Sequence, residues 1–413
     1  MLDEYRGIPR QAQLLVILSA VPSIALGWLT TDISYYLTTV QGVPTFWGGL
    51  TISMFGYAVV VSSIPLGILA DRVGRRRLLI LGNVAQGASL LGFALTTNVG
   101  LLVLFGASEG LGEAAFAVSL SALIADRAGD AKRTSAFSLG FFVNWIGMAV
   151  GAALTNFAAI VANADLFALL GVASVAVTPI ALGVTDTPHL VGPRRSILPS
   201  KSGRVLKKFG VYAACIGLGS GFFVTLMTQW FKGRYGVPDY VSGNVLVFSY
   251  FVTAGVILLS PRLAKRLGTA KTIVVTQAPA TVVMLGVPYS PTFPISGTIY
   301  VVRVFLMNLG NPLGQSLLMG LVSPDERGAA SGLVAVANRL PNALTALPGL
   351  IMIGAGQYYY PFYFAAVLYT IAIAWFWLAF RKERLPEEST EARTMPSRPG
   401  WKDSLTPAES PRP

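Results

Sequence analysis

The sequence contains little charge, one histidine and one cysteine, and each scarcity excludes a class of protein. Charged residues make up 12% of the chain, whereas a soluble domain has about 25%. Cys215 is the single cysteine and can form no internal disulfide, and with the single histidine, His189, it gives no spacing typical of a metal site. One histidine also argues against Ser/His/Asp catalysis. We therefore predict no metal site, no catalytic residues and no enzyme activity.

What the sequence does contain is apolar surface. Hydrophobic residues make up 53% of the 413 residues, and the mean hydropathy is +0.61. A membrane-spanning helix needs about 20 mostly apolar residues, and the pattern predicts twelve such helices. Their approximate bounds are residues 14–38, 45–70, 78–97, 100–125, 135–161, 166–184, 210–231, 240–264, 272–290, 296–322, 329–354 and 360–380.

The net charge of +12 is unevenly distributed along the chain. Lys and Arg precede the first predicted span, occupy alternate loops and follow the last span, whereas the other loops contain only Lys232 and Arg234. Basic loops mark the cytoplasmic side of a membrane. The pattern predicts a multi-pass plasma-membrane protein with both termini cytoplasmic and no nucleic-acid partner. Residues 1–13 mix acids and bases and lead directly into a span, so we expect no cleavable signal peptide.

The two halves of the chain repeat one another. Asp71 and Lys265 stand in similar basic loops at an offset of 194 (265 − 71 = 194), and the same offset aligns the Gly-Val-Pro at 42–44 with that at 236–238. Duplicated membrane halves are the architecture of secondary transporters, which bind substrate between the halves. We therefore predict an all-α membrane protein with twelve helices in two pseudo-symmetric six-helix bundles.

Two segments interrupt the apolar pattern. One is rich in proline and basic residues and lies between the halves, and the other begins at Arg381 and is rich in Pro, Ser, Glu and Arg. Such a composition cannot bury a core and predicts disorder for the tail. The expected organisation is an N-terminal bundle (1–184), a cytoplasmic linker (185–209), a C-terminal bundle (210–380) and a disordered cytoplasmic tail (381–413).

A motif after the second predicted span resembles the signature loop of the major facilitator superfamily. It reads Gly67-x-x-x-Asp71-Arg72-x-Gly74-Arg75-Arg76. The segment 323–332 resembles the corresponding loop in the second half of that superfamily. The resemblance covers about residues 12–380 and implies the fold of the superfamily and activity as a transporter.

The resemblance also implies a gate at the cytoplasmic side. In similar proteins the acid at Asp71 meets the positive N-terminus of a helix in the other half, which here begins near residues 327–329. Asp126 is expected to join this contact through Arg72 or Arg75; the alternative is that the arginines only set topology. Because the repeat has Lys265 in place of Asp71, we expect an asymmetric gate. The predicted gate residues are Gly67, Asp71, Arg72, Gly74, Arg75, Arg76, Asp126, Arg133 and Arg327.

Five ionisable residues fall inside predicted spans, where a charge is costly and therefore functional by default. The acids Asp32, Glu109 and Glu113 are candidates for proton coupling, because a cavity that opens alternately to each side changes their hydration. Arg303 and Arg339 are candidates for substrate binding. The alternative is a static ion pair, such as Glu113 with Arg339, that joins the two halves.

Amide and aromatic side chains at similar depth predict a substrate cavity. Several amides lie one helical turn apart, as at 338 and 342, and so share a helix face. For the aromatic residues the alternative is a role in the membrane-interface belt or in packing. The candidates are Tyr36, Asn144, Trp145, Trp230, Arg303, Asn308, Asn311, Gln315, Asn338, Arg339 and Asn342.

Local differences from the usual motifs of known subfamilies leave the subfamily of this chain open. Drug/proton antiporters of the superfamily usually carry an arginine and a glutamine where this chain has Gly106 and Glu109, and the proline of their helix-5 motif is missing from residues 147–152. The run 110–116 is similar to helix 4 of other branches, including lysolipid and organic-anion carriers.

These observations predict a proton-coupled secondary transporter of a small organic molecule that works by alternating access. Export of drugs or metabolites is slightly favoured, and uptake of an organic anion is the alternative. A membrane scaffold or enzyme is a distant third. The expected partners are the small-molecule substrate and the lipid bilayer, the expected state is a monomer, and no cofactor is expected beyond a proton gradient.

Overall fold

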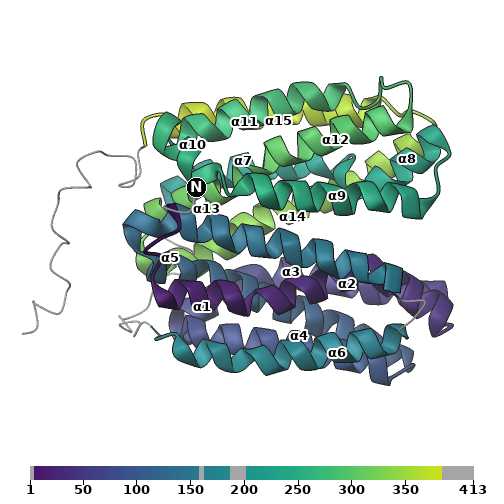
Figure 1. The fold of residues 1–413 in the computed structure, drawn as a ribbon, viewed down its shortest axis with the longest axis horizontal. Coiled ribbons are helices and arrows are strands. Elements are labelled where there is room, and N and C mark those ends of the chain that lie inside the picture. The colour runs from purple at the N-terminus through teal and green to yellow at the C-terminus, as the bar shows by residue number, and fades with distance from the viewer. Residues whose placement is uncertain (1–3, 158–161, 187–200, 384–413) are drawn as a thin grey trace, which may run out of the picture.

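The computed structural model describes residues 4–157, 162–186 and 201–383, and the described chain is almost entirely helical (Figure 1). This agrees with the predicted all-α class. His189, most of the predicted linker and nearly all of the predicted tail lie outside the described residues.

The N-terminal half is built from six helices and three short irregular turns. They are α1 (Arg10–Leu18), α2 (Ala20–Tyr35) with a π-helical turn at Tyr36–Val40, α3 (Thr45–Val73), α4 (Arg75–Leu95), α5 (Val99–Ala153) with a 3₁₀ turn at Leu154–Phe157, and α6 (Asn163–Val177) with a 3₁₀ turn at Thr178–Gly183.

The C-terminal half contains nine helices. They are α7 (Gly203–Gly221), α8 (Met227–Tyr235), α9 (Asp239–Ile257), α10 (Ser260–Leu267), α11 (Thr269–Leu285), α12 (Phe293–Asn308), α13 (Asn311–Leu321), α14 (Arg327–Gly354) and α15 (Tyr360–Phe380), with 3₁₀ turns at Val224–Leu226 and Pro324–Glu326.

The helix α5 accounts for two passages of the predicted twelve. It has 55 residues, which would extend about 80 Å at 1.5 Å per residue, far more than the ~30 Å hydrocarbon core of a bilayer. The chain turns back at Gly129, whose φ of 67° suits glycine. By length and hydropathy, eight described helices qualify as spans, or nine with the bent α9–α10 pair. The second arm of α5, the short α11 and the more polar α14 coincide with the three remaining predicted spans, and the count of twelve stays a prediction.

The two halves approach most closely between α3 and α14. A Cβ atom at Gly67 would lie 2.4 Å from the carbonyl oxygen of Gly328, and one at Gly332 would lie 2.1 Å from that of Ser63. Only glycine permits such backbone contact, and small residues are what helices use to approach closely in lipid. Figure 1 shows the purple-to-teal N-terminal half beside the green-to-yellow C-terminal half.

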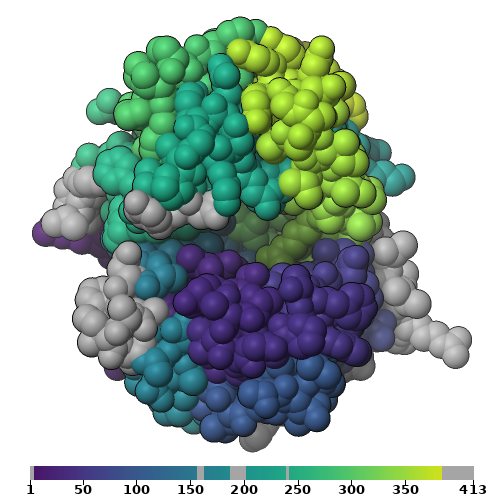
Figure 2. All heavy atoms as spheres, turned by 90° about the vertical axis from the view of Figure 1, so that its right-hand side faces the viewer, coloured from purple at the N-terminus to yellow at the C-terminus, as the bar shows by residue number. Residues whose placement is uncertain are grey.

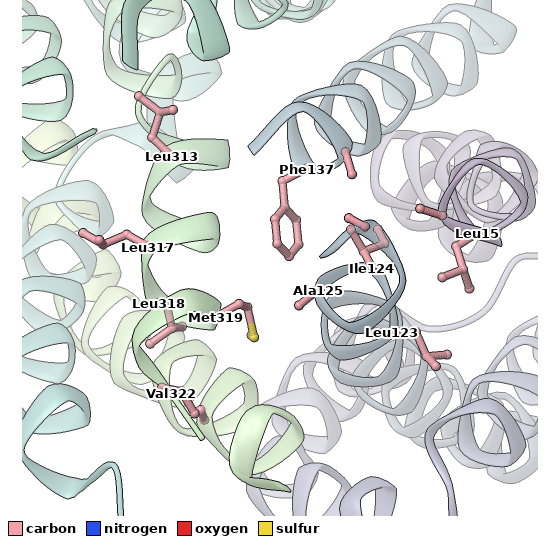
Figure 3. Close-up of a cluster of buried hydrophobic side chains, with 14 of the residues drawn as sticks. Leu15, Leu123, Ile124, Ala125, Phe137, Leu313, Leu317, Leu318, Met319 and Val322 are labelled. Carbon is pink, nitrogen blue, oxygen red and sulfur yellow. The ribbon is translucent and has the colours of Figure 1, made fainter. Parts of the chain in front are cut away.

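An apolar cluster closes the molecule between the halves at one end. Figure 3 shows Phe137 and Ala125 of α5 facing Met319 and Leu318 of α13. This end also carries the loops with Arg75, Lys265 and Arg327, and we call it the basic end. Figure 2 faces the other end, where the surface is hollowed between the two halves.

Candidate substrate cavity and gate

A cavity of about 730 Å³ lies between the two halves. Its walls come from α2, α3 and α5 on one side and from α7, α9 and α11 to α15 on the other. Pockets of roughly 300–1,000 Å³ accommodate drug-sized molecules. The volume therefore suits a small organic ligand held between two duplicated bundles.

Most of the predicted polar candidates line this cavity. Asn144 and Trp145 come from α5, and the indole of Trp145 lies 5.2 Å from the ring of Tyr250 between centroids. The remaining predicted residues on the lining are Glu113, Arg303, Asn308, Asn311, Gln315, Asn338 and Arg339.

Three predicted candidates are placed away from the lining, because each packs within its own half. The Tyr36 hydroxyl donates to the carbonyl of Phe93 at 3.2 Å. The Trp230 indole donates to the carbonyl of Tyr358 at 3.0 Å. The Asn342 amide donates to the hydroxyl of Ser220 at 2.7 Å. Their polar groups serve packing inside a bundle and not the cavity.

Sequence reasoning missed several polar lining residues, the larger of which are Tyr212, Tyr250, Gln277, Tyr300 and Tyr369. The hydroxyl of Tyr212 donates to the amide oxygen of Gln277 at 2.9 Å, which joins α7 to α11. An amide inside an apolar helix was an available signal for Gln277. The tyrosines gave none, because a tyrosine in a membrane helix is more often part of the interface belt.

The three candidate acids occupy different surroundings. Glu113 lines the cavity and accepts hydrogen bonds from Gln86 at 3.1 Å and from Arg339 at 3.4 Å. Glu109 is buried one turn earlier on the same helix, and its Oε2 has no hydrogen-bond partner among the described residues. Asp32 is buried between α2 and α6 and accepts from Asn163 at 2.6 Å. Of the three, Glu113 alone faces the cavity.

At the basic end, Asp71 binds the start of α14 directly. Its carboxylate accepts the backbone N–H groups of Gly328 at 3.1 Å and Ala329 at 3.0 Å. These are unsatisfied donors of a helix N-terminus, where the helix dipole also favours a negative charge. Arg75, the first residue of α4, donates two N–H groups to the same carboxylate, the closer at 2.6 Å. The structure thus places Asp71, the predicted gate acid, against the N-terminus of α14, the helix predicted to be its partner.

Asp126 extends this contact into a chain of alternating charges. It forms an ion pair with Arg75 and a second with Arg327 at 2.6 Å. Arg75 also donates to the carbonyl of Pro324 at 2.5 Å, which again crosses between the halves. All four side chains of the set Asp71, Arg75, Asp126 and Arg327 are less than a tenth exposed. We call this set the charge gate.

The other predicted gate residues surround the charge gate without joining it. Arg72 is exposed, and Arg133 pairs with Asp130 on the same helix. The backbone N–H of Arg76 donates to Asp186 at 3.4 Å. Gly74 has a φ of 117°, and a Cβ there would lie 2.5 Å from the carboxylate of Asp186. Glycine at this position therefore lets the chain turn tightly from α3 into α4.

The N-terminal segment makes a second contact across the halves at the basic end. Glu4 pairs with Lys265, the residue that occupies the position of Asp71 in the repeat. The Tyr5 hydroxyl donates to the carbonyl of Leu258 at 2.7 Å. Burial raises the pKa of Tyr5 to about 12, so this donor keeps its proton. The two halves thus differ at this position as expected: Asp71 contacts a helix N-terminus, whereas Lys265 pairs with Glu4 of the N-terminal segment.

Exchanging the charges of Glu4 and Lys265 tests this contact. Each single change, Glu4→Lys or Lys265→Glu, is expected to lower the unfolding midpoint slightly, and the double change is expected to restore it. The pair is partly exposed, so its coupling energy should be about 0.2–1 kcal/mol and should fall at high salt. Thermal unfolding in detergent at two salt concentrations measures it, and additive single effects would show that the residues do not interact.

Comparison with known proteins adds family information to this geometry. The family model described as Major Facilitator Superfamily matches residues 14–311 and 299–408. The inner membrane transport protein YajR of Escherichia coli (strain K12) is 26% identical over 175 residues, or 41% of this chain. The uncharacterized MFS-type transporter YdeE of the same organism is 32% identical over 109 residues, or 25% of this chain. The matches span 38% of YajR and 28% of YdeE.

Solved structures share the fold. A bacterial homologue of the iron transporter ferroportin in an outward-facing state has a TM-score of 0.74 at 14% identity, over 90% of this chain and 100% of that one. The human organic anion transporter MFSD10 (TETRAN) has a TM-score of 0.72 at 16% identity, over 89% of this chain and 100% of that one. At such low identity the likeness concerns the fold alone.

Proposed function

Because this chain belongs to the major facilitator superfamily, we propose that it transports a small organic molecule across a membrane by alternating access, coupled to proton movement. The observation that carries the proposal is a cavity between duplicated halves that is closed at one end by the charge gate. The opposite end is hollowed between the halves (Figure 2). A closed gate on one side and an opening on the other is one of the two states that alternating access requires.

We further propose that the basic end faces the cytoplasm of a plasma-membrane protein that acts as a monomer. The support is the excess of Lys and Arg in the loops of this end, since such loops stay cytoplasmic. In this orientation the described state faces outward, and both termini are cytoplasmic.

Site-directed labelling tests the orientation. Thr97 and Ala131 are both exposed. Thr97 lies just before the first arm of α5, and Ala131 lies just after the break at Gly129 that ends this arm. In a Cys215→Ala background, a membrane-impermeant maleimide should label Thr97→Cys in intact cells and Ala131→Cys only in inside-out vesicles. Labelling of both positions from the same side would contradict the assignment of the first arm of α5 as a membrane passage.

Glu113 is the proposed coupling acid, because it faces both the cavity and the opposite half. The charged group facing it from α14 is Arg339, α4 contributes the uncharged Gln86, and Glu109 lies one turn away on its own helix. The lining residues of α2 and α3 are uncharged. Adding a proton to Glu113 removes the ion pair that crosses the cavity, so protonation and rearrangement of the halves are linked.

The cavity lining bears on the charge of the transported molecule. Three acids in the cavity would favour protons or cationic cargo and two arginines would favour anionic cargo, but of the three acids only Glu113 lines the cavity, whereas Arg303 and Arg339 both do. This balance favours the organic anion of the second candidate. Cationic cargo would meet two arginines and one acid.

Reconstitution tests the proposed function. Purified protein in liposomes should accumulate a labelled substrate when a pH gradient is imposed, and a protonophore should abolish the accumulation. Candidate substrates come from a thermal-shift screen of anionic, neutral and cationic metabolites at two pH values. A saturable flux of substrate that does not depend on the pH gradient would support transport and refute proton coupling. No saturable flux of any ligand that binds would refute transport.

A further inference from the structure

Arg303 is the buried charge of the cavity that lacks a counter-ion. The charged residues of the lining are Glu113, Arg303 and Arg339. Glu113 and Arg339 pair with each other. In the part of the chain that the structure describes, the ion pairs do not include Arg303. With the pair neutral, the cavity carries one net positive charge.

Two aromatic rings hold the Arg303 guanidinium in place. Its Cζ lies 4.9 Å from the ring centroid of Phe223 and 5.5 Å from that of Tyr369. One terminal N–H group donates to the hydroxyl of Tyr369 at 2.9 Å, and Nε is buried without a hydrogen-bond partner among the described residues. The residue is 4% exposed, so the side chain does not extend to the membrane surface.

This arrangement fixes a cation but does not neutralise it. Contacts with aromatic faces compensate part of the cost of removing a guanidinium from water, yet a buried charge normally has an opposite charge as well. A guanidinium presents a planar fork of N–H donors that matches a carboxylate. The two aromatic rings hold the guanidinium of Arg303 in place and leave some of its N–H donors without partners. Such a site is suited to an anionic ligand that enters the cavity.

We propose that the transported molecule is a small organic anion and that its carboxylate binds Arg303 on the C-terminal wall of the cavity. This rests on the proposed transport function and adds the substrate class to it. Val304 and Met307 line the cavity on the same helix as Arg303, and the paired rings of Trp145 and Tyr250 line it as well, one from each half. An apolar or aromatic body therefore accompanies the carboxylate of the ligand.

The position of Arg339 predicts that proton and anion travel in the same direction. Arg339 is 43% exposed on its side chain, and among the described residues its ion pair is a long contact of 3.4 Å with Glu113. A proton on Glu113 releases Arg339, so that a second guanidinium becomes available to an anion in the same cavity. Since coupling is reciprocal, a proton that favours the anion is in turn favoured by it. Binding of both before reorientation is symport.

Matched probes with one body and different head groups test the substrate class. Naphthalene-2-carboxylate, naphthalene-2-carboxamide and naphthalen-2-ylmethylammonium, together with smaller carboxylates such as benzoate and acetate, are titrated against purified protein while the heat of binding and the thermal stability are followed. We expect the aromatic carboxylate to bind at least about tenfold more tightly than its amide, as for hydrogen bonds to a charged partner. The ammonium should bind most weakly.

Two neutral replacements assign the preference to one side chain. Arg303→Gln and Arg303→Met should bind carboxylate and amide within about twofold of each other, whereas Arg303→Lys should keep part of the preference. If the neutral variants fail to fold, Arg303→Lys and Tyr369→Phe carry the test. Each keeps a positive charge and both aromatic rings, and each should reduce the preference for the carboxylate only partly. Tyr235→Phe is the matched control, because that hydroxyl bonds to Ser290 outside the cavity and its loss should leave the preference unchanged.

The outcomes separate this proposal from the proposed function. Equal binding of acid and amide, tightest binding of the ammonium, or no binding of any carboxylate at millimolar concentration would overturn the anion class. If a neutral or cationic compound is then accumulated in liposomes under a pH gradient, the transport function stands and only the substrate class fails. A carboxylate preference that survives Arg303→Gln would overturn the site.

Discussion

An Asp71→Asn variant is expected to lose most of its transport while its folding is little changed. The reason is that two contacts of Asp71 join the two halves and would have to break for the basic end to open. It accepts two backbone N–H groups of α14, at Gly328 and Ala329. An asparagine keeps one acceptor oxygen and turns an NH₂ group toward the remaining donors, so one helix N–H group loses its partner and the helix dipole loses its counter-charge.

The size of the effect follows from burial. Asp71 and Arg75 are 8% and 1% exposed on their side chains, and breaking one partner of a buried ionic contact costs about 3–5 kcal/mol. Because asparagine retains part of the hydrogen bonding, we expect the closed state to lose about 2–3 kcal/mol. This shifts the ratio of closed to open protein by roughly 30-fold to 150-fold. The variant should therefore accumulate with the basic end open.

A cysteine at the sealed end of the cavity reports this shift. Ser316 is fully buried and accepts a hydrogen bond from Thr134 across the halves at 2.8 Å. In a Cys215→Ala background, Ser316→Cys should react slowly with an impermeant maleimide in inside-out vesicles. Adding Asp71→Asn should speed the reaction by about tenfold or more, because the labelled fraction follows the open population.

The matched control is Asp130→Asn. Asp130 lies at the same end and also pairs with an arginine, but it is 69% exposed and its partner Arg133 is on the same helix. Its replacement should change neither labelling nor transport. Normal transport by Asp71→Asn, or equal labelling rates with and without it, would reduce the signature loop to a topology signal.

The residues of the charge gate could be predicted from the sequence because each of its two sides is marked by a short local motif. The motif fixes Asp71 at the end of α3 and Arg75 at the start of α4, so they are four residues apart and pair across one turn. The repeat and the Ser-Pro-Asp-Glu-Arg segment located the start of α14. The sequence left Arg72 and Arg75 as equal partners for Asp126, and the structure selects Arg75 because Arg72 points to the exposed side.

The cavity was harder to predict, because its lining depends on how each helix is rotated. Asn338 and Asn342 share a helix face, yet Asn338 lines the cavity while Asn342 bonds within the C-terminal half to Ser220. Asn338 also donates to α7, at the carbonyl of Ala213, so the two amides differ only in how the packing of α14 on α7 exposes them, which no sequence period reports. Arg303 was recognised as a costly charge, but its ring partners on α15 and before α8 are set by tertiary packing alone.

A Glu113→Gln variant is expected to bind substrate but to lose proton-driven accumulation. Glutamine keeps the shape of the protonated acid, so the state without an ion pair to Arg339 becomes permanent. Exchange of labelled for unlabelled substrate across liposomes should continue, since it requires no net proton movement.

The structure revises what this substitution should cost in stability. A fully buried pair loses about 3–5 kcal/mol when one partner is removed. The Glu113–Arg339 contact is long at 3.4 Å, and Arg339 is 43% exposed, so a loss of up to about 1 kcal/mol is expected instead. Unfolding of Glu113→Gln and of the double variant with Arg339→Gln should therefore stay close to that of the parent protein. A large loss in the single variant that the double variant repairs would identify a static pair.

The other two acids decide whether Glu113 is the coupling residue. Asp32→Asn and Glu109→Gln make the same chemical change at positions that do not line the cavity. If Glu113 carries the proton, both variants should retain gradient-driven accumulation, although Glu109→Gln changes a buried group next to it on the helix. Accumulation lost in Asp32→Asn or Glu109→Gln, with Glu113→Gln still coupled, would move the proton site away from the cavity and remove its link to Arg339. Loss confined to Glu113→Gln, with exchange intact, ties the proton to the one of these three acids that lines the cavity and pairs with the opposite half.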